Sequence, residues 1–211
     1  MKINNTKKII GYTSENVEDW KIELEDWLFK LGFIPLQLPM HDNSWINNIQ
    51  FLDALILTGG GHISSQIAEY DKPKKCKWCN ITRDVNELKL LKGCHSKIPI
   101  LGICRGMQLL WTYLKLGSLK WYKNLDVELI NRGIFKHSFG SDFKVNFKWL
   151  PYTENWMDYS DKIIHFQNNY PMTIRFDELT LGTMFHLNSS KLHNTDTLLF
   201  KTFLEQELNN A

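Results

Sequence analysis

The sequence from residue 99 reads Pro99-Ile100-Leu101-Gly102-Ile103-Cys104-Arg105-Gly106. Its apolar part is typical of a buried parallel strand. The apolar residues from Met107 to Leu114 recur at helical spacing, so a helix is expected directly after Cys104. A cysteine between two glycines at a strand-to-helix junction has the G-x-C-x-G form of a nucleophile elbow, whose sharp turn strains the nucleophile and needs small neighbours. The helix N-terminus favours a thiolate. The competing interpretation is a structural cysteine in an ordinary turn, and the flanking strand and helix favour the elbow.

Strand and helix patterns alternate on the N-terminal side of this stretch. Strands are predicted near residues 9–12 and 35–38, with a helix over 17–31 that Gly32 ends. A further buried strand at 54–57 runs into Thr58-Gly59-Gly60-Gly61. The next helix is expected to begin near Thr82, with three apolar side chains on its inner face: Val85, Leu88 and Leu91.

The C-terminal half is richer in strands, with candidates at 144–147, 163–166, 172–176 and 181–186. A closing helix is expected to turn four side chains inward: Leu198, Leu199, Phe203 and Leu208. Repeated strand–helix units predict a doubly wound, mostly parallel sheet with helices on both faces, formed by a single domain over 1–211.

The composition is that of an ordinary globular protein. The chain has 211 residues, 43% hydrophobic and 23% charged, with a formal charge of +2. Dispersed basic residues argue against nucleic-acid binding. No apolar stretch approaches the ~20 residues that span a bilayer, and no signal-peptide core follows the polar N-terminus. We therefore expect a cytoplasmic protein without a disulfide framework.

Acyl transfer at Cys104 would require donors aimed at the tetrahedral oxyanion. The backbone N–H of Arg105 is one candidate. The glycine run is the other, because Gly59, Gly60 and Gly61 follow a neighbouring buried strand and could present bare N–H groups.

Five segments together resemble a known family, the class I glutamine amidotransferase-like proteins, and best its γ-glutamyl hydrolase branch. Residues 101–110 resemble its elbow and 57–61 its oxyanion strand. Arg83-Asp84-x-x-Glu87 is similar to its R-D-x-x-E helix start, 182–186 to its histidine-bearing strand, and 199–203 to its terminal helix. The resemblance implies a flavodoxin-like fold and a Cys–His–Glu triad that hydrolyses γ-glutamyl amides through a thioester.

Carried over residue by residue, the resemblance makes Cys104 the nucleophile and His186 its base. Where the family has H-P-E, this chain reads His186-Leu187-Asn188, so Asn188 would orient the imidazole, as in Cys–His–Asn triads. Gly60 and Arg105 would supply the oxyanion hole. Substrate contacts are expected from five residues: Gly59, Gly61, Gln108, Arg83 and Asn146. The family's V-N-S-x-H stretch is reduced here to Val145-Asn146-Phe147-Lys148-Trp149, so the pocket should differ.

Three functions follow from these residues. The first is a stand-alone hydrolase that acts on a small γ-glutamyl substrate without cofactor or metal. The second is a glutaminase subunit that delivers ammonia to a partner synthetase. The third is a silent binding protein.

Two motifs remain open. Arg83 and Glu87 fit a helix-surface ion pair as well as a substrate rim. Cys76 and Cys79 fit loop thiols better than half of a zinc site.

Overall fold

A computed structural model describes residues 7–14, 19–70, 79–121, 149–152, 163–167, 170–184, 201–205 and 208. Several predictions fall outside these ranges, namely the strand at 144–147 and the residues Cys76, Asn146, His186, Asn188, Leu198 and Leu199. Within the ranges, no helix is both long and apolar enough to cross a lipid bilayer.

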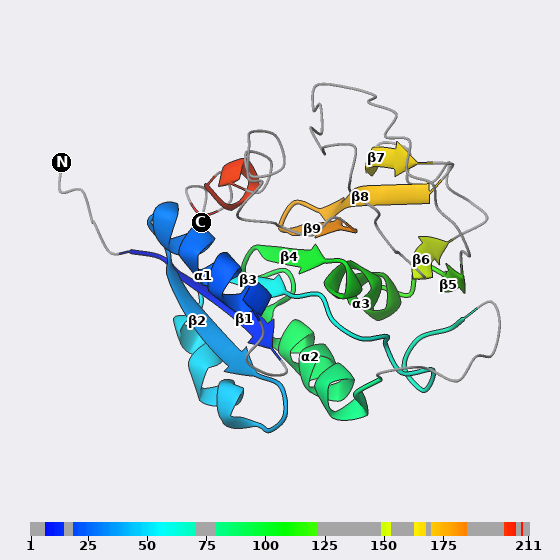
Figure 1. Ribbon diagram of the computed structural model, residues 1–211, viewed down its shortest axis with the longest axis horizontal. Coiled ribbons are helices and arrows are strands. Elements are labelled where there is room, and N and C mark those ends of the chain that lie inside the picture. The colour runs from blue at the N-terminus through cyan, green and yellow to red at the C-terminus, as the bar shows by residue number, and fades with distance from the viewer. Residues whose placement is uncertain are drawn as a thin grey trace.

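Seven strands form one sheet in the order β2-β1-β3-β4-β9-β8-β7 (Figure 1). The strands along the chain are β1 (Ile9–Ser14), β2 (Ile34–Pro39), β3 (Ala54–Leu57), β4 (Ile100–Ile103), β7 (Ile163–Gln167), β8 (Tyr170–Asp177) and β9 (Thr180–Thr183). The five strands from β2 to β9 are parallel, whereas β8 and β7 continue the sheet antiparallel. The predicted flavodoxin-like, doubly wound fold is confirmed.

The helices cover both faces of this sheet, as Figure 1 shows. On one face, α1 (Asp19–Lys30) and the helical residues 201–205 pack on alternate strand residues such as Ile56 and Leu101. On the other face, α2 (Ile81–Cys94) and α3 (Arg105–Tyr113) pack on Leu55, Leu57 and Ile100. Because side chains alternate along a strand, the continuous apolar runs of β3 and β4 supply both cores.

Several predicted boundaries agree with the structure. Gly32 adopts a positive φ of 87°, and Phe33 N–H donates to Leu28 O at 3.0 Å, so α1 ends in a Schellman motif. Phe203 and Leu208 are buried as predicted.

The inner face predicted for α2 is wrong for Val85, which is 37% exposed, and Leu88 is only partly buried. The first turns of α2 instead bury three charged residues: Arg83, Asp84 and Glu87. Compared with the apolar pattern, α2 is rotated so that its charged side chains face the elbow. It takes this orientation because Asp84 and Glu87 pair there with Arg105.

Two elements have no counterpart in the sequence analysis. One is the 3-10 helix η1 (Ser44–Phe51), which buries Trp45. The other is a small antiparallel sheet of β5 (Ser118–Trp121) and β6 (Trp149–Tyr152).

Candidate active site

Cys104 occupies a strained turn between β4 and α3. Its φ of 52° and ψ of −105° lie outside the ordinary regions for a residue with a side chain. It is the N-cap of α3, and its side chain is half-buried. Strain of this kind persists only where the surroundings enforce it, and it is frequent at functional sites.

The two glycines of the elbow are required by close backbone packing. A Cβ on Gly106 would lie 2.1 Å from Leu57 O, because the first turn of α3 rests on the end of β3. A Cβ on Gly102 would lie 2.6 Å from a Leu110 methyl group and 2.7 Å from the Gly106 carbonyl. The motif therefore has the steric cause that the elbow prediction assumed.

The elbow is also tied to β9. Cys104 N–H donates to Thr183 O at 2.6 Å, and Ile103 pairs in register with Thr183. The chain that leads to His186 thus departs from beside Cys104.

The glycine run follows β3, the neighbour of β4. Thr58 anchors its start, donating from Oγ1 to Thr13 O at 2.5 Å and from N–H to Thr13 Oγ1 at 3.2 Å. Gly60 is exposed and has a φ of +144°, which side-chain-bearing residues rarely adopt. A Cβ there would lie 3.7 Å from Arg105 Cδ, so the glycine run and the elbow are in contact range.

A buried ionic network lies behind these two loops. Arg83 Nε donates to Glu87 Oε1 at 2.9 Å, and Arg105 donates to Glu87 Oε2 and to Asp84 Oδ1. All four side chains are at most 3% exposed. Asp84 also accepts the Ser64 N–H at 2.7 Å. The network therefore connects α2 to the residue that follows the candidate nucleophile.

Arg83 extends the network to the glycine run. Its Nη2 donates to Gly59 O at 2.9 Å, to Thr58 Oγ1 at 3.1 Å and to Thr58 O at 3.3 Å. The sequence left two positions open for Arg83, a helix-surface ion pair and the substrate rim. The ion pair with Glu87 forms, but with 1% of Arg83 exposed it lies at neither of those surface positions.

The pairing favours the charged forms of Glu87 and Arg105. Burial alone would raise the pKa of Glu87, but the positive charges of Arg105 and Arg83 outweigh it and hold that pKa below its usual value. Burial would lower the pKa of Arg105, and the two carboxylates outweigh it and raise that pKa. Burial does raise the pKa of Asp84, which Arg105 offsets only in part.

The Cys104 thiol differs from the thiolate that the sequence predicted. Burial raises its pKa to about 11, although the Arg105 backbone N–H and positive charge act in the opposite direction. Cys104 is partly buried and packs against residues of both cores. Desolvation thus outweighs the helix N-terminus, and the resting thiol is neutral near pH 7.

The structure brings together part of the predicted site. Cys104, Arg105, Gly59, Gly60 and Arg83 meet at the carboxyl ends of β3 and β4. Two others lie on the same elements, Gly61 in the glycine run and Gln108 in the second turn of α3, 7% exposed.

Sequence reasoning gave no site role to Thr13 or Asp84, and it left Glu87 between a helix-surface ion pair and a substrate rim rather than in a buried network. The signal for Asp84 and Glu87 was present, because R-D-x-x-E places three charged residues on one helix face.

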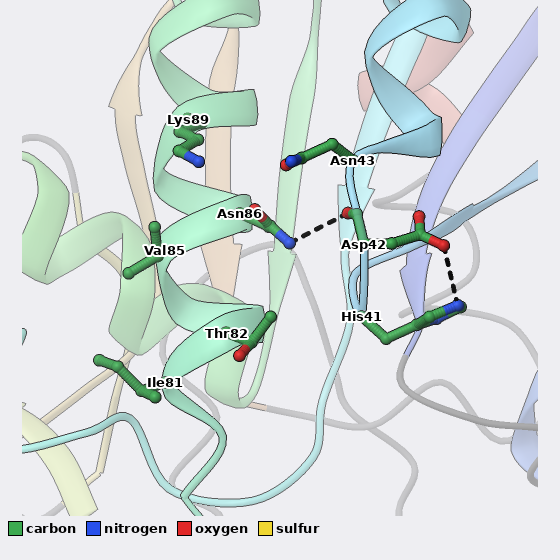
Figure 2. A pocket seen from close by; sticks show the side chains of 8 residues that line it. All are labelled: His41, Asp42, Asn43, Ile81, Thr82, Val85, Asn86 and Lys89. Atoms are coloured by element: carbon green, nitrogen blue, oxygen red, sulfur yellow. Dashed lines mark hydrogen bonds and ion pairs between the residues drawn. The ribbon is translucent and has the colours of Figure 1, made fainter.

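A separate pocket of about 350 Å³ lies on the other side of α2 (Figure 2). Asn86 closes its floor by donating to Met40 O and Asp42 O, at 2.9 and 3.0 Å. None of the predicted site residues lines it. Among the described residues, no three His, Cys, Asp or Glu side chains are placed to hold a metal ion.

Comparison with known proteins agrees with this geometry. The Peptidase C26 family pattern matches residues 12–125, more than half of the chain. A glutamine amidotransferase-like protein of Rickettsia prowazekii is 36% identical over 87 residues, or 40% of this chain and 31% of that protein. The YvdE protein of Lactococcus lactis subsp. lactis, also described as glutamine amidotransferase-like, is 34% identical over 85 residues, or 39% of this chain and 36% of that protein. The matches thus span about a third of these relatives.

Two solved structures share the fold across the whole chain. A protein of Thermoplasma acidophilum described as one of the subunits of GMP synthase superposes with a TM-score of 0.52 at 16% identity, covering 98% of this chain and 100% of that one. A chain of PurLQS from Thermotoga maritima gives a TM-score of 0.50 at 16% identity, covering 97% and 99%. With the elbow, the sheet order and the family pattern in agreement, this chain belongs to the Peptidase C26 family of class I glutamine amidotransferase-like proteins.

Proposed function

We propose that this chain is a cysteine-dependent hydrolase that cleaves γ-glutamyl amide bonds. The observation that carries the proposal is the display of Cys104 at φ 52°, between two glycines that admit no side chain. Such a strained and sterically enforced turn gives no packing advantage to a structural cysteine. It does place a sulfur at the end of a parallel sheet where a substrate can approach.

In the proposed reaction the Cys104 sulfur attacks the γ-carbonyl carbon while His186 takes the thiol proton. The tetrahedral oxyanion is held by the N–H groups of Gly60 and Arg105. His186 then protonates the departing nitrogen. The amine departs, and a γ-glutamyl thioester remains on Cys104. Water, deprotonated by His186, adds to the thioester and releases glutamate and the thiol.

Chain length supports the role of His186. Thr183 pairs with Ile103 beside the elbow, and three further residues lead to His186. Three residues reach at most about 10 Å, so the length of chain after Thr183 is compatible with the proposed contact between His186 and the thiol. We propose that Asn188 orients this imidazole through its side-chain oxygen, in place of the family's carboxylate.

The neutral thiol also defines how the base must act. With a pKa of about 11, Cys104 is not a preformed thiolate. His186 therefore removes the proton as the substrate binds and water leaves, rather than holding a permanent ion pair. We propose that Gly59, Gly61, Gln108 and Asn146 contact the glutamyl group.

The same raised pKa supports a second candidate, a glutaminase subunit that awaits a synthetase. One structural neighbour is described as a subunit of GMP synthase, and the other is a chain of PurLQS. In that case a partner would complete the site, and ammonia rather than another amine would be the product.

The test is glutamate release from a panel of γ-glutamyl amides, with glutamine included. We expect turnover that disappears in Cys104→Ala and persists in Cys79→Ala, a control on a second half-buried thiol. Turnover that survives Cys104→Ala would refute the mechanism. Covalent labelling of Cys104 by a glutamine-analogue electrophile without turnover would favour the glutaminase subunit or the silent binding protein.

A further inference from the structure

The glycine run contains a peptide group that Arg83 holds in place. Arg83 Nη2 donates to Gly59 O at 2.9 Å. The Gly59 carbonyl belongs to the same planar unit as the Gly60 N–H, and in a trans peptide the two point in opposite directions. A guanidinium on the carbonyl side therefore directs the Gly60 N–H away from Arg83.

The Gly60 N–H is available on that side. Gly60 is exposed, and among the described residues none accepts a hydrogen bond from its N–H. It also lies beside Arg105, the residue after the candidate nucleophile.

We infer that Arg83 is a positioning residue for the oxyanion hole, which aims and polarises the Gly59–Gly60 peptide through its bond to the Gly59 carbonyl. The inference rests on the proposed function and deepens it. A cation bonded to a peptide oxygen draws electron density toward that oxygen, so the N–H at the other end becomes a stronger donor. The oxyanion would thus sense the Arg83 charge through one peptide, although the guanidinium never touches the substrate.

The surroundings hold Arg83 in this one position. Glu87 accepts its Nε–H at 2.9 Å, while Thr58 accepts twice from Nη2. Its Nη1 would lie only 2.5 Å from a Cβ on Gly60, so the guanidinium packs directly against that glycine. Lysine could not reproduce these contacts, because it lacks the planar fork of donors.

The size of the effect follows from oxyanion holes in general. Loss of a donor lowers kcat about 10²- to 10³-fold. Arg83→Lys keeps the charge but loses the fork, so we expect kcat to fall about tenfold or more while KM changes less than about threefold. Arg83→Gln removes the charge as well and should lower kcat further.

Two readouts separate positioning from a merely structural role. Iodoacetamide alkylates Cys104 by direct displacement, which forms no oxyanion, so its rate in Arg83→Lys should equal that of the wild type. The NMR chemical shift of the Gly60 amide proton should move upfield in Arg83→Lys, because the charged hydrogen bond to the Gly59 carbonyl is weakened. Arg175→Lys is the matched control, because Arg175 also donates to a backbone carbonyl, that of Glu178 at 2.7 Å, at the opposite end of β8 from the elbow.

Unchanged kcat in Arg83→Lys would overturn the inference, as would alkylation that falls in parallel with turnover. An unchanged chemical shift of the Gly60 amide proton in Arg83→Lys would overturn the inference, even if the wild type hydrolyses no γ-glutamyl amide. In that last case the proposed function fails, and an upfield shift in Arg83→Lys still supports the role of Arg83 in aiming the peptide.

Discussion

Replacement of Glu87 by alanine would break the buried network at its centre. Glu87 is fully buried and accepts hydrogen bonds from both Arg83 and Arg105. In Glu87→Ala, Arg105 retains its bond to Asp84, whereas Arg83 loses its Glu87 carboxylate and retains its bonds to Gly59 O and Thr58. Removal of one partner from a buried ion pair costs about 3–5 kcal/mol, because an uncompensated charge stays in the interior.

For a chain of this length, each kcal/mol shifts the thermal midpoint by about 2–4 °C. The midpoint of Glu87→Ala should therefore fall by roughly 6–20 °C. The assay is urea unfolding followed by circular dichroism, with thermal melts in parallel. An unchanged urea slope would assign the difference to stability.

The chain offers a matched control in Lys201 and Glu205. They form the same i,i+4 ion pair as Arg83 and Glu87, but at 3.7 Å and with 41% and 45% of the side chains exposed. Glu205→Ala should cost no more than about 0.5 kcal/mol. The reasoning is refuted if Glu87→Ala loses less than about 1 kcal/mol, or no more than Glu205→Ala.

Three further outcomes are expected. Gly106→Ala should lower the unfolding midpoint and abolish labelling of Cys104, because its Cβ would meet Leu57 O at 2.1 Å. Gly93→Ala, in α2, should raise the midpoint, because its Cβ would meet only Ile49 Cδ1, at 3.7 Å; equal shifts in the two variants would contradict the steric explanation. With a pKa of about 11, the iodoacetamide rate at Cys104 should rise about tenfold per pH unit from pH 7 to 10, since only the thiolate reacts; a plateau below pH 8 would show a lower pKa. Asn188→Glu should raise kcat about tenfold or more by restoring a carboxylate behind the imidazole, and an unchanged kcat would mean that residue 188 does not contact His186.

The parallel part of the fold could be predicted from the sequence because its signals are local. The runs in β3 and β4 are wholly apolar, and strands buried on both faces have that composition. The elbow was predictable for a related reason. Its glycines are fixed by contacts with residues a few positions away or on the adjacent strand.

The orientation of α2 was not predictable in the same way. Apolar periodicity assigned Val85 to the inner face, but Asp84 and Glu87 occupy it because Arg105 lies opposite. That partner is 18 to 21 residues away along the chain. A sequence pattern assigns charged residues to the exposed surface unless their partners are known. The raised pKa of the Cys104 thiol was unpredictable for the same reason. Desolvation of the thiol depends on both hydrophobic cores, whereas the local motif indicates only the helix N-terminus.

The pairing of β4 with β9 has a consequence for the order in which the protein is made. Cys104 leaves the ribosome soon after β3 and β4, whereas Thr183, which accepts its backbone N–H, is nearly 80 residues later. At 5–20 residues per second, that interval is about 4–16 seconds. Throughout it, one edge of β4 has no strand beside it and the cysteine lacks its final neighbours. A nascent chain would therefore carry the Cys104 thiol for several seconds without its neighbour on β9, and any reaction that needs the finished elbow could begin only after β9 has paired with β4.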